Sequence, residues 1–281
     1  MRLTTSDHDR GNANLTYVYP VVSRRAQGVS VGVNLNPNSA CNWRCAYCQV
    51  PGLVRGKGPE IDLALLRAEL GGLLRDIVSG DFMERRVPEG SRRLNDVAFS
   101  GNGEPTTSPS FPEAVELAGE LLGELGLLGS VKLLLITNGS LADQPRVAAA
   151  LERMGQLGGE VWFKVDSVTR EGLRAINDTA VDPQDHLARL ARTAARCPTW
   201  VQTCVFARDG APPSEGERAA YLGALRGLVA ARTPLRGVHL YGLARTSHQP
   251  EAARLSALPA AWLEELAREI EAAGLPARVS V

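Results

Sequence analysis

The chain has 281 residues, and its 31 Lys and Arg balance 31 Asp and Glu. This length suits one α/β barrel or two smaller domains, and it allows a hydrophobic core without disulfide staples. The zero net charge excludes a polybasic nucleic-acid coat and an acidic disordered tail, so extended nucleic acid is a disfavoured partner. No run reaches the roughly 20 apolar residues that span a bilayer, and the N-terminus lacks a signal-peptide pattern. We therefore expect a cytoplasmic protein with reduced thiols and no membrane partner.

Strand-like and helix-like segments alternate along most of the chain, and later strands begin about 30–40 residues apart, as in βαβ units. The predicted strands are Val29–Asn36, Asp96–Gly101, Val131–Thr137, Glu160–Asp166, Thr199–Phe206 and Gly237–Gly242. The predicted helices, one after each strand, are Ile61–Val78, Pro112–Leu125, Gln144–Met154, Asp185–Arg196, Ser214–Ala231 and Ala260–Ala273. A short seventh strand is expected at Ala277–Val281. Alternation of this kind predicts a parallel sheet.

Six β/α units are too few for a closed eight-stranded barrel. We predict an α/β fold of the open, partial (β/α)6 TIM-like type over residues 29–281, preceded by an irregular N-terminal arm at residues 1–28. A flat, doubly wound sheet is the alternative. The first unit is longer than the rest because Pro37–Glu60 follows its strand. Loops at the carboxyl ends of parallel strands carry function, so this insertion is expected on the functional face.

Three of the five cysteines stand within this insertion, in the segment Cys41-Asn-Trp-Arg-Cys45-Ala-Tyr-Cys48. Their spacing also fits one face of a buried helix, but prolines at 37 and 51 bracket the segment. A structural zinc site needs a fourth ligand, and no Cys or His stands nearby to supply one. Three thiolates suit a four-iron cluster, because each ligand holds one iron and one iron stays open to an external ligand.

The segment resembles the C-x3-C-x-aromatic-C motif of the radical S-adenosylmethionine (SAM) enzymes. The resemblance implies a [4Fe-4S] cluster on Cys41, Cys45 and Cys48, SAM on the open iron, and Tyr47 near the adenine. It also implies one-electron reduction by a donor such as flavodoxin or ferredoxin. SAM would then be cleaved to methionine and a 5′-deoxyadenosyl radical, which abstracts hydrogen from a substrate.

The second predicted strand ends in a turn with an acid, Gly101-Asn102-Gly103-Glu104. Glycines let a backbone approach a ligand closely, and carbonyls together with Glu104 can receive an ammonium group. By itself, the turn is equally well a plain strand-to-helix loop. Following the cysteines, it resembles the family's Gly-Gly-Glu motif, which binds the SAM amine, with Asn102 in place of the first glycine.

The third and fourth predicted strands also end in polar residues. Thr137–Gly139 is either a helix-entry turn or a further SAM contact. In the fourth strand, the two-residue period places Trp162, Lys164 and Asp166 on one face. A charged face on a buried parallel strand predicts a ligand cavity, with an internal Lys–Asp ion pair as the alternative.

Several roles rest on the resemblance or stay open. Asp166 and Ser167 lie where the family contacts the ribose or carboxylate of SAM, and Lys164 is a SAM contact, a substrate anchor or a Schiff base. Gln202 and Tyr241 are polar residues within apolar strands, either facing the substrate or satisfied in the core. The candidate catalytic residues are Lys164, Tyr241 and Arg245; the candidate cofactor-binding residues are Tyr47, Gly101, Asn102, Gly103, Glu104, Thr137, Asn138, Lys164, Asp166, Ser167 and Gln202; the candidate metal ligands are Cys41, Cys45 and Cys48.

Within the family, the stretches FSGNGEP, WFKVDS, VQT and HLYGLAR resemble most the branch containing the wyosine-type tRNA-modifying synthases. That branch holds a second cluster on upstream cysteines, and this chain has no Cys before Cys41, which counts against wyosine synthesis itself. We rank a small-molecule or nucleoside substrate first, activation of a glycyl-radical enzyme second and tRNA-base modification third. A metal- or cluster-binding regulator is the alternative from another class. Cys197 and Cys204 are interpreted as core thiols.

Overall fold

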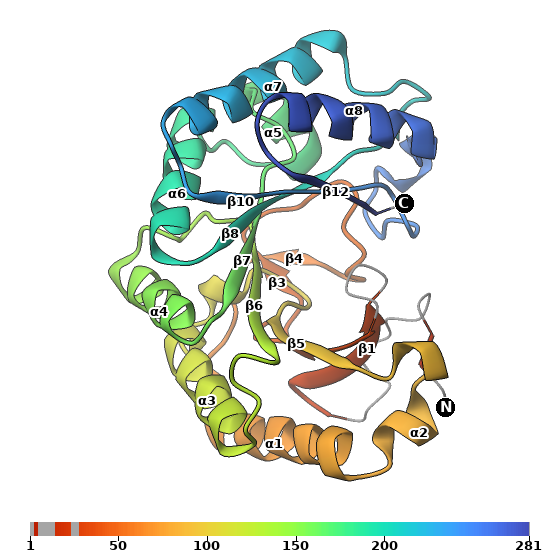
Figure 1. Cartoon of the computed structure of the whole chain (residues 1–281). Coiled ribbons are helices and arrows are strands. Elements are labelled where there is room, and N and C mark those ends of the chain that lie inside the picture. Colours follow the sequence, from red (N-terminus) through yellow and green to blue (C-terminus); the bar gives the residue numbers. More distant parts are fainter. Residues whose placement is uncertain (1–2, 5–14, 24–27, 281) are drawn as a thin grey trace.

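The computed structural model describes residues 3–4, 15–23 and 28–280. Its main sheet has eight strands in the order β1-β2-β5-β6-β7-β8-β10-β12 and curls into an open half-barrel (Figure 1). Seven strands are parallel: β2 (Gly28–Val33), β5 (Leu94–Phe99), β6 (Lys132–Thr137), β7 (Glu160–Lys164), β8 (Thr199–Cys204), β10 (Leu235–Tyr241) and β12 (Ala277–Ser280). The predicted partial barrel and its seventh strand are therefore confirmed.

Helices cover the convex side of the sheet (Figure 1). Six of them match predicted helices to within two residues at each end: α1 (Leu63–Ser79), α3 (Phe111–Glu124), α4 (Pro145–Gln156), α6 (Pro183–Arg196), α7 (Glu215–Ala230) and α8 (Ala260–Ala272). Their starts follow local chemistry, since Asp62 caps α1 by accepting from Leu65 N, and Asp182 caps α6 in the same way. The short helices α2 (Phe82–Arg86) and α5 (Arg170–Asn177) were not expected from the sequence.

The expectation of an irregular arm over residues 1–28 is wrong for residues 18–23. Strand β1 (Val18–Ser23) pairs antiparallel with β2 at the edge of the sheet. Pro20 disfavours a strand in the sequence, but an edge strand tolerates proline because one side of its backbone needs no partner. Most of the remaining arm lies outside the described residues.

Alternation along each strand separates the core from the concave face. On β5, Val97 and Phe99 are fully buried in the core that includes the inner faces of α1 and α3. Their neighbours Asp96 and Ala98 line a cavity on the other side of the sheet. The sheet thus presents a continuous apolar face to the helices and a partly polar face to the interior of the half-barrel.

The Pro37–Glu60 insertion lies at the carboxyl end of β2, as expected. Within it, β3 (Ala40–Cys41) and β4 (Val54–Arg55) form a two-stranded ladder. A second small ladder joins β9 (Ala207–Arg208) to β11 (Leu255–Ser256). In the part of the chain that the structure describes, no helix is both long and apolar enough to cross a membrane.

Candidate active site

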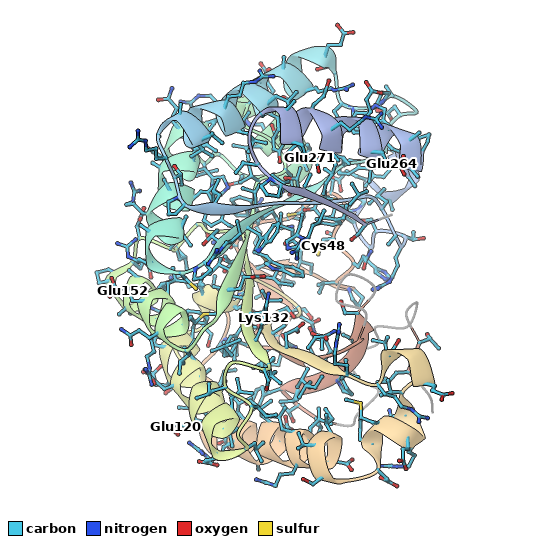
Figure 2. The ribbon with its side chains drawn as sticks, in the orientation of Figure 1. Cys48, Glu120, Lys132, Glu152, Glu264 and Glu271 are labelled. Carbon is cyan, nitrogen blue, oxygen red and sulfur yellow. The ribbon has the colours of Figure 1, made fainter. Side chains whose placement is uncertain are left out.

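A cavity of about 800 Å³ occupies the concave side of the half-barrel. All three motif cysteines line it, and Figure 2 shows Cys48 on this concave side, whereas Glu120 and Glu152 lie on the outer helices. Most of the candidate residues meet here: Tyr47, Gly101, Asn102, Gly103, Glu104, Thr137, Asn138, Lys164, Gln202, Tyr241 and Arg245. The fold therefore brings the ends of successive strands together at one cavity, as expected.

The cysteine loop, residues 41–48, is held from two sides by distant segments. On one side, the backbone N–H groups of Arg44 and Ala46 donate to the carbonyls at the end of α5. On the other, Ser247 Oγ donates to the Ala46 carbonyl at 2.7 Å, and His248 N donates to the Cys48 carbonyl at 2.9 Å. The loop is irregular because its hydrogen bonds are tertiary, which rules out a continuous helix carrying the three thiols.

Ion pairs add to this anchoring. The Arg44 guanidinium bridges Asp178 and Glu251, each with an N–O distance of 3.0 Å. Arg55 of β4 also pairs with Asp178 at 2.7 Å. These groups are partly exposed, so each pair contributes little by itself. Together they join the loop to two segments far away in the sequence.

The three thiols are free and partly accessible from the cavity. Burial raises the pKa of the Cys41 thiol to about 12, and the nearby Glu104 carboxylate adds to the effect. Burial likewise raises the pKa of Cys45 to about 12. Asn177 Nδ2 lies 3.2 Å from the Cys45 sulfur and is positioned to donate to it. Without a bound cation, Cys41 and Cys45 hold their protons at neutral pH.

These residues fit an iron–sulfur cluster. Among the described residues, no three His, Cys, Asp or Glu side chains are grouped around one point that a single metal ion would occupy. A four-iron cluster does not need such a point, because each thiolate binds a different iron. A side-chain N–H group aimed at a ligand sulfur is also one of the ways in which proteins tune such clusters.

The glycine turn after β5 leaves room for close backbone contacts. A Cβ on Gly103 would lie 2.0 Å from the Ala40 carbonyl oxygen, next to Cys41. Gly101 has φ +146°, and a Cβ there would lie 2.5 Å from Asn34 Oδ1. Asn34 Oδ1 in turn accepts from Asn102 N at 3.1 Å. The turn is thus fitted against the cysteine loop at a distance that only glycine allows.

Glu104 is 3% exposed and ties the turn to the end of β6. Its Oε1 accepts from the hydroxyls of Thr106 at 2.7 Å and Thr137 at 2.6 Å, and its Oε2 accepts from Asn138 N at 2.6 Å. Burial raises the pKa of Glu104, and these donors oppose the shift. The carboxylate is therefore largely satisfied by the protein and acts first as a positioning group for the two loops.

Lys164 lies at the centre of a buried polar network. Its Nζ donates to Tyr47 Oη at 2.7 Å and to Tyr241 Oη at 3.3 Å, and it lies 4.0 Å from Asp166 Oδ2. Burial opposes the ammonium charge, but the negative charge of Asp166 acts the other way, and the pKa of Lys164 is raised well above its ordinary value. Lys164 is consequently an ammonium group at neutral pH.

Asp166 and Ser167 do not line the cavity. Asp166 Oδ2 accepts from Tyr47 Oη at 2.6 Å and from Asn177 Nδ2 at 2.7 Å, and Oδ1 accepts from Cys204 N at 2.9 Å. Ser167 Oγ donates to Glu217 of α7 at 2.8 Å, on the helix side of the sheet. Asp166 thus holds the cysteine loop against β7 and β8, and Ser167 belongs to a separate, largely apolar pocket of about 360 Å³. Asp166 keeps the face predicted by the two-residue period, since its Oδ2 lies 4.0 Å from Lys164 Nζ, but Tyr47 and Asn177 bind the same oxygen and the residue does not line the cavity. The alternative of an internal Lys–Asp ion pair therefore describes this pair.

The end of the cavity far from the cysteine loop, called the lower end from here on, carries two polar residues that the sequence reasoning missed, Ser30 and Asp96. Ser30 Oγ on β2 donates to Asp96 Oδ1 on β5, and both residues line the cavity with Trp162 and Gln202. Burial raises the pKa of Asp96 to about 6. The sequence contains a signal for Asp96, because the two-residue period of a strand places it on the same face as Ala98 and Ser100. The same period places Lys164 on one face with Trp162.

Two further residues escaped the sequence reasoning. Asn177, which contacts both Asp166 and Cys45, ends the short helix α5. Its eight residues are fewer than the window of about 11 over which a helical period is read from a sequence. Cys204 is 2% exposed, as a core thiol would be, but it also borders the cavity.

Solved structures with the same fold share little sequence with this chain. A radical SAM methyltransferase from Sphaerobacter thermophilus matches with a TM-score of 0.59 at 16% identity, covering 90% of this chain and 66% of the other. A structure of TYW1 with a lysine-pyruvate adduct bound matches with a TM-score of 0.55 at 15% identity, covering 88% and 74%. These similarities support the half-barrel fold.

Similar curated proteins are found in distant organisms. A UPF0026 protein of Helicobacter pylori strain J99 is 31% identical over 166 residues, which is 58% of this chain and 47% of that protein. A UPF0026 protein of Methanocaldococcus jannaschii is 29% identical over 163 residues, covering 56% and 42%. The chain thus spans about half the length of these relatives.

The family model of the Radical SAM superfamily matches residues 35–208. This range contains the cysteine loop, the glycine turn, Lys164 and Gln202, so the match covers most of the candidate residues that the cavity brings together, though not Tyr241 and Arg245. The chain belongs to the radical SAM superfamily, which implies SAM and an iron–sulfur cluster as its cofactors.

Proposed function

We propose that the protein cleaves SAM reductively and uses the resulting 5′-deoxyadenosyl radical to abstract hydrogen from a small-molecule or nucleoside-like substrate. The observation that carries the proposal is one cavity lined by three accessible cysteines, the glycine turn and a buried lysine. Cys41, Cys45 and Cys48 would hold a [4Fe-4S] cluster. When bound and reduced, the cluster supplies the single electron that breaks the carbon–sulfur bond of SAM, releasing methionine.

The protein's part is to hold SAM and exclude water. The turn from Gly101 to Gly103 borders the cavity next to Cys41, and backbone carbonyls of such a turn suit the amine of SAM. Glu104 fixes that turn against Asn138, so its role is to position the turn rather than to reach SAM itself.

Lys164 suits an anion better than a Schiff base. A Schiff base requires a neutral amine, whereas Lys164 is held as an ammonium beside Asp166. Its Nζ borders the cavity between Tyr47 and Tyr241, so a carboxylate of SAM or of the substrate can receive it. We assign Lys164 and Tyr241 to this role, with Arg245 on the loop after β10 at the cavity rim.

The electron comes from a reduced protein donor such as flavodoxin or ferredoxin, as radical SAM enzymes in general require one. Two other reactions are open to a radical SAM enzyme, the activation of a glycyl-radical enzyme and the modification of a tRNA base. Balanced charge disfavours the tRNA substrate, because binding a nucleic acid draws on cationic side chains to neutralise phosphates.

Anaerobic reconstitution tests the proposal. The purified chain should bind about four irons, and with dithionite and SAM it should form 5′-deoxyadenosine. Replacing Cys41, Cys45 or Cys48 by alanine should abolish this product, whereas the matched variant Cys197→Ala, at a buried thiol outside the cavity, should retain it. Product formation that survives all three replacements, or a protein that holds only zinc and binds no SAM, would refute the proposal.

A further inference from the structure

The lower end of the cavity has a chemistry that the cluster and SAM do not explain. Ser30 and Asp96 are register partners on β2 and β5, and Asp96 stands four residues before Ser100 at the strand's carboxyl end. At about 3.3 Å per residue, Asp96 lies about 13 Å along the strand from the glycine turn. The cavity continues over this whole distance, so it has room for a second ligand below SAM.

Asp96 is a buried carboxyl group with only half of its hydrogen bonds made. It is 6% exposed, and among the described residues only Ser30 donates to it, at Oδ1. The nearest cation, Lys132 at the start of β6, is engaged by Glu160 at 3.0 Å. Asp96 lines the cavity, and a ligand that covers its second oxygen removes that oxygen from water, so the ligand has to supply a donor in return.

Gln202 on β8 also has a side-chain oxygen without a hydrogen-bond donor, in the same cavity. Its side chain is 3% exposed, and in the described part of the chain no donor reaches its Oε1. A primary amide carries both a donor and an acceptor, and therefore pairs best with a ligand edge that carries both. Asp96 and Gln202 come from different strands, so the shortage of hydrogen-bond donors at each is an independent observation.

The remaining surfaces around these groups are apolar and rigid. Leu134, Ile136 and the Trp162 indole line the same region. The Trp162 ring stands 4.4 Å from the His239 ring, which in turn stacks on Trp200 at 4.4 Å. Trp162 Nε1 donates to Glu160 at 2.8 Å, which fixes the plane of the indole. Flat apolar walls of this kind suit a planar group.

We propose that this end of the cavity recognises a nitrogen-bearing planar substrate, which donates a hydrogen bond from an amine or a ring N–H to Asp96 and pairs its edge with Gln202. This inference rests on the proposed function, since it names the class of substrate that the radical attacks. The shared chemistry is an N–H donor in a molecule that also carries a flat ring. An arylalkylamine and a nucleobase both supply it.

Binding measurements with three probes test the inference and separate the two sources. Isothermal titration of the reconstituted, SAM-loaded enzyme should show binding of benzylamine, of guanosine, or of both. If a ring N–H is recognised, 1-methylguanosine should bind at least tenfold more weakly than guanosine. Asp96→Asn should weaken either bound probe about tenfold, and Gln202→Leu should weaken guanosine about tenfold, as expected for losing one hydrogen bond to a buried group. Glu152→Gln, on the outside of α4, should leave the affinity unchanged.

Binding of no probe at millimolar concentration would overturn the inference. So would equal affinity in the wild type and both cavity variants, provided that iron content and circular dichroism show the variants to be folded. Failure of the proposed function is seen separately, as absent iron or absent 5′-deoxyadenosine in the wild type. The two results are therefore distinguishable.

Discussion

The two ends of the cavity use buried acids in opposite ways. At the upper end, beside the cysteine loop, Asp166 lies behind the residues that line the cavity and accepts three hydrogen bonds. Glu104, which lines the cavity, accepts from two threonine hydroxyls and a backbone N–H. At the lower end, Asp96 accepts from Ser30 alone among the described residues. All three are at most 8% exposed, so burial does not distinguish them.

The difference lies in how the neighbouring loops supply donors. The upper acids stand where several strand ends and the cysteine loop meet, so side chains of several elements and the backbone N–H groups of Asn138 and Cys204 reach them. Asp96 lies within a strand whose own N–H groups are used by the sheet ladder. A satisfied buried acid fixes a structure, whereas an unsatisfied one that borders a cavity is available to a ligand.

The largest expected effect is the loss of a satisfied acid. Asp166→Ala leaves Lys164, Tyr47 and Asn177 without their common acceptor, so it should destabilise the fold by about 3–5 kcal/mol. For a chain of this size, the thermal midpoint should fall by about 10 °C. Calorimetry of the chain without its cluster measures this, with Glu152→Gln as the exposed control. A shift below about 2 °C would show that the network contributes no net stability.

Replacing the unsatisfied acid should do the reverse. Burial raises the pKa of Asp96 from 3.8 to about 6, so between these values the folded chain binds the proton more tightly than the unfolded chain. The contribution of Asp96 to the free energy of unfolding therefore falls as the pH rises from about 4 to about 6, by about 2–3 kcal/mol. Asp96→Asn should remove this fall and be more stable than the wild type at pH 8.

Denaturant titrations across this pH range measure the effect. The difference between wild type and Asp96→Asn isolates the contribution of Asp96, because every other titrating group is common to both. A variant that is less stable than the wild type at pH 8 would mean that Asp96 is satisfied in the folded chain. The contrast between the two ends of the cavity would then disappear.

The smallest effect concerns the glycines that shape the upper end. Gly103→Ala places a Cβ against the Ala40 carbonyl and should cost about 1–3 kcal/mol, with a weaker affinity for SAM. The matched variant Gly72→Ala, within α1 and with no atom near the added Cβ, should stabilise the chain by about 0.5–1 kcal/mol. Urea unfolding and SAM titration compare the two. Equal stability changes of the same sign would show that the turn is not closely fitted to the cysteine loop.

Much of the site was predictable because it lies close together in the sequence. Cys41, Cys45 and Cys48 stand within one loop, and the period of each strand determines which residues share a face. The alternation of strands with amphipathic helices along the chain predicts the parallel sheet of the barrel. Those inferences need only local patterns and the geometry of a single element.

Only the tertiary structure decided what each polar residue does. Asp166 and Lys164 are two residues apart, yet one is enclosed by Asn177 and Cys204 and the other faces the cavity. Pro20 permits a strand only because β1 lies at an edge. Whether a buried acid is satisfied depends on donors from other elements, here 33 residues away for Thr137 and Glu104 and 119 for Tyr47 and Asp166. The sequence determined which chemical groups reach this cavity, and the packing of distant segments determined which of them remain available to a ligand.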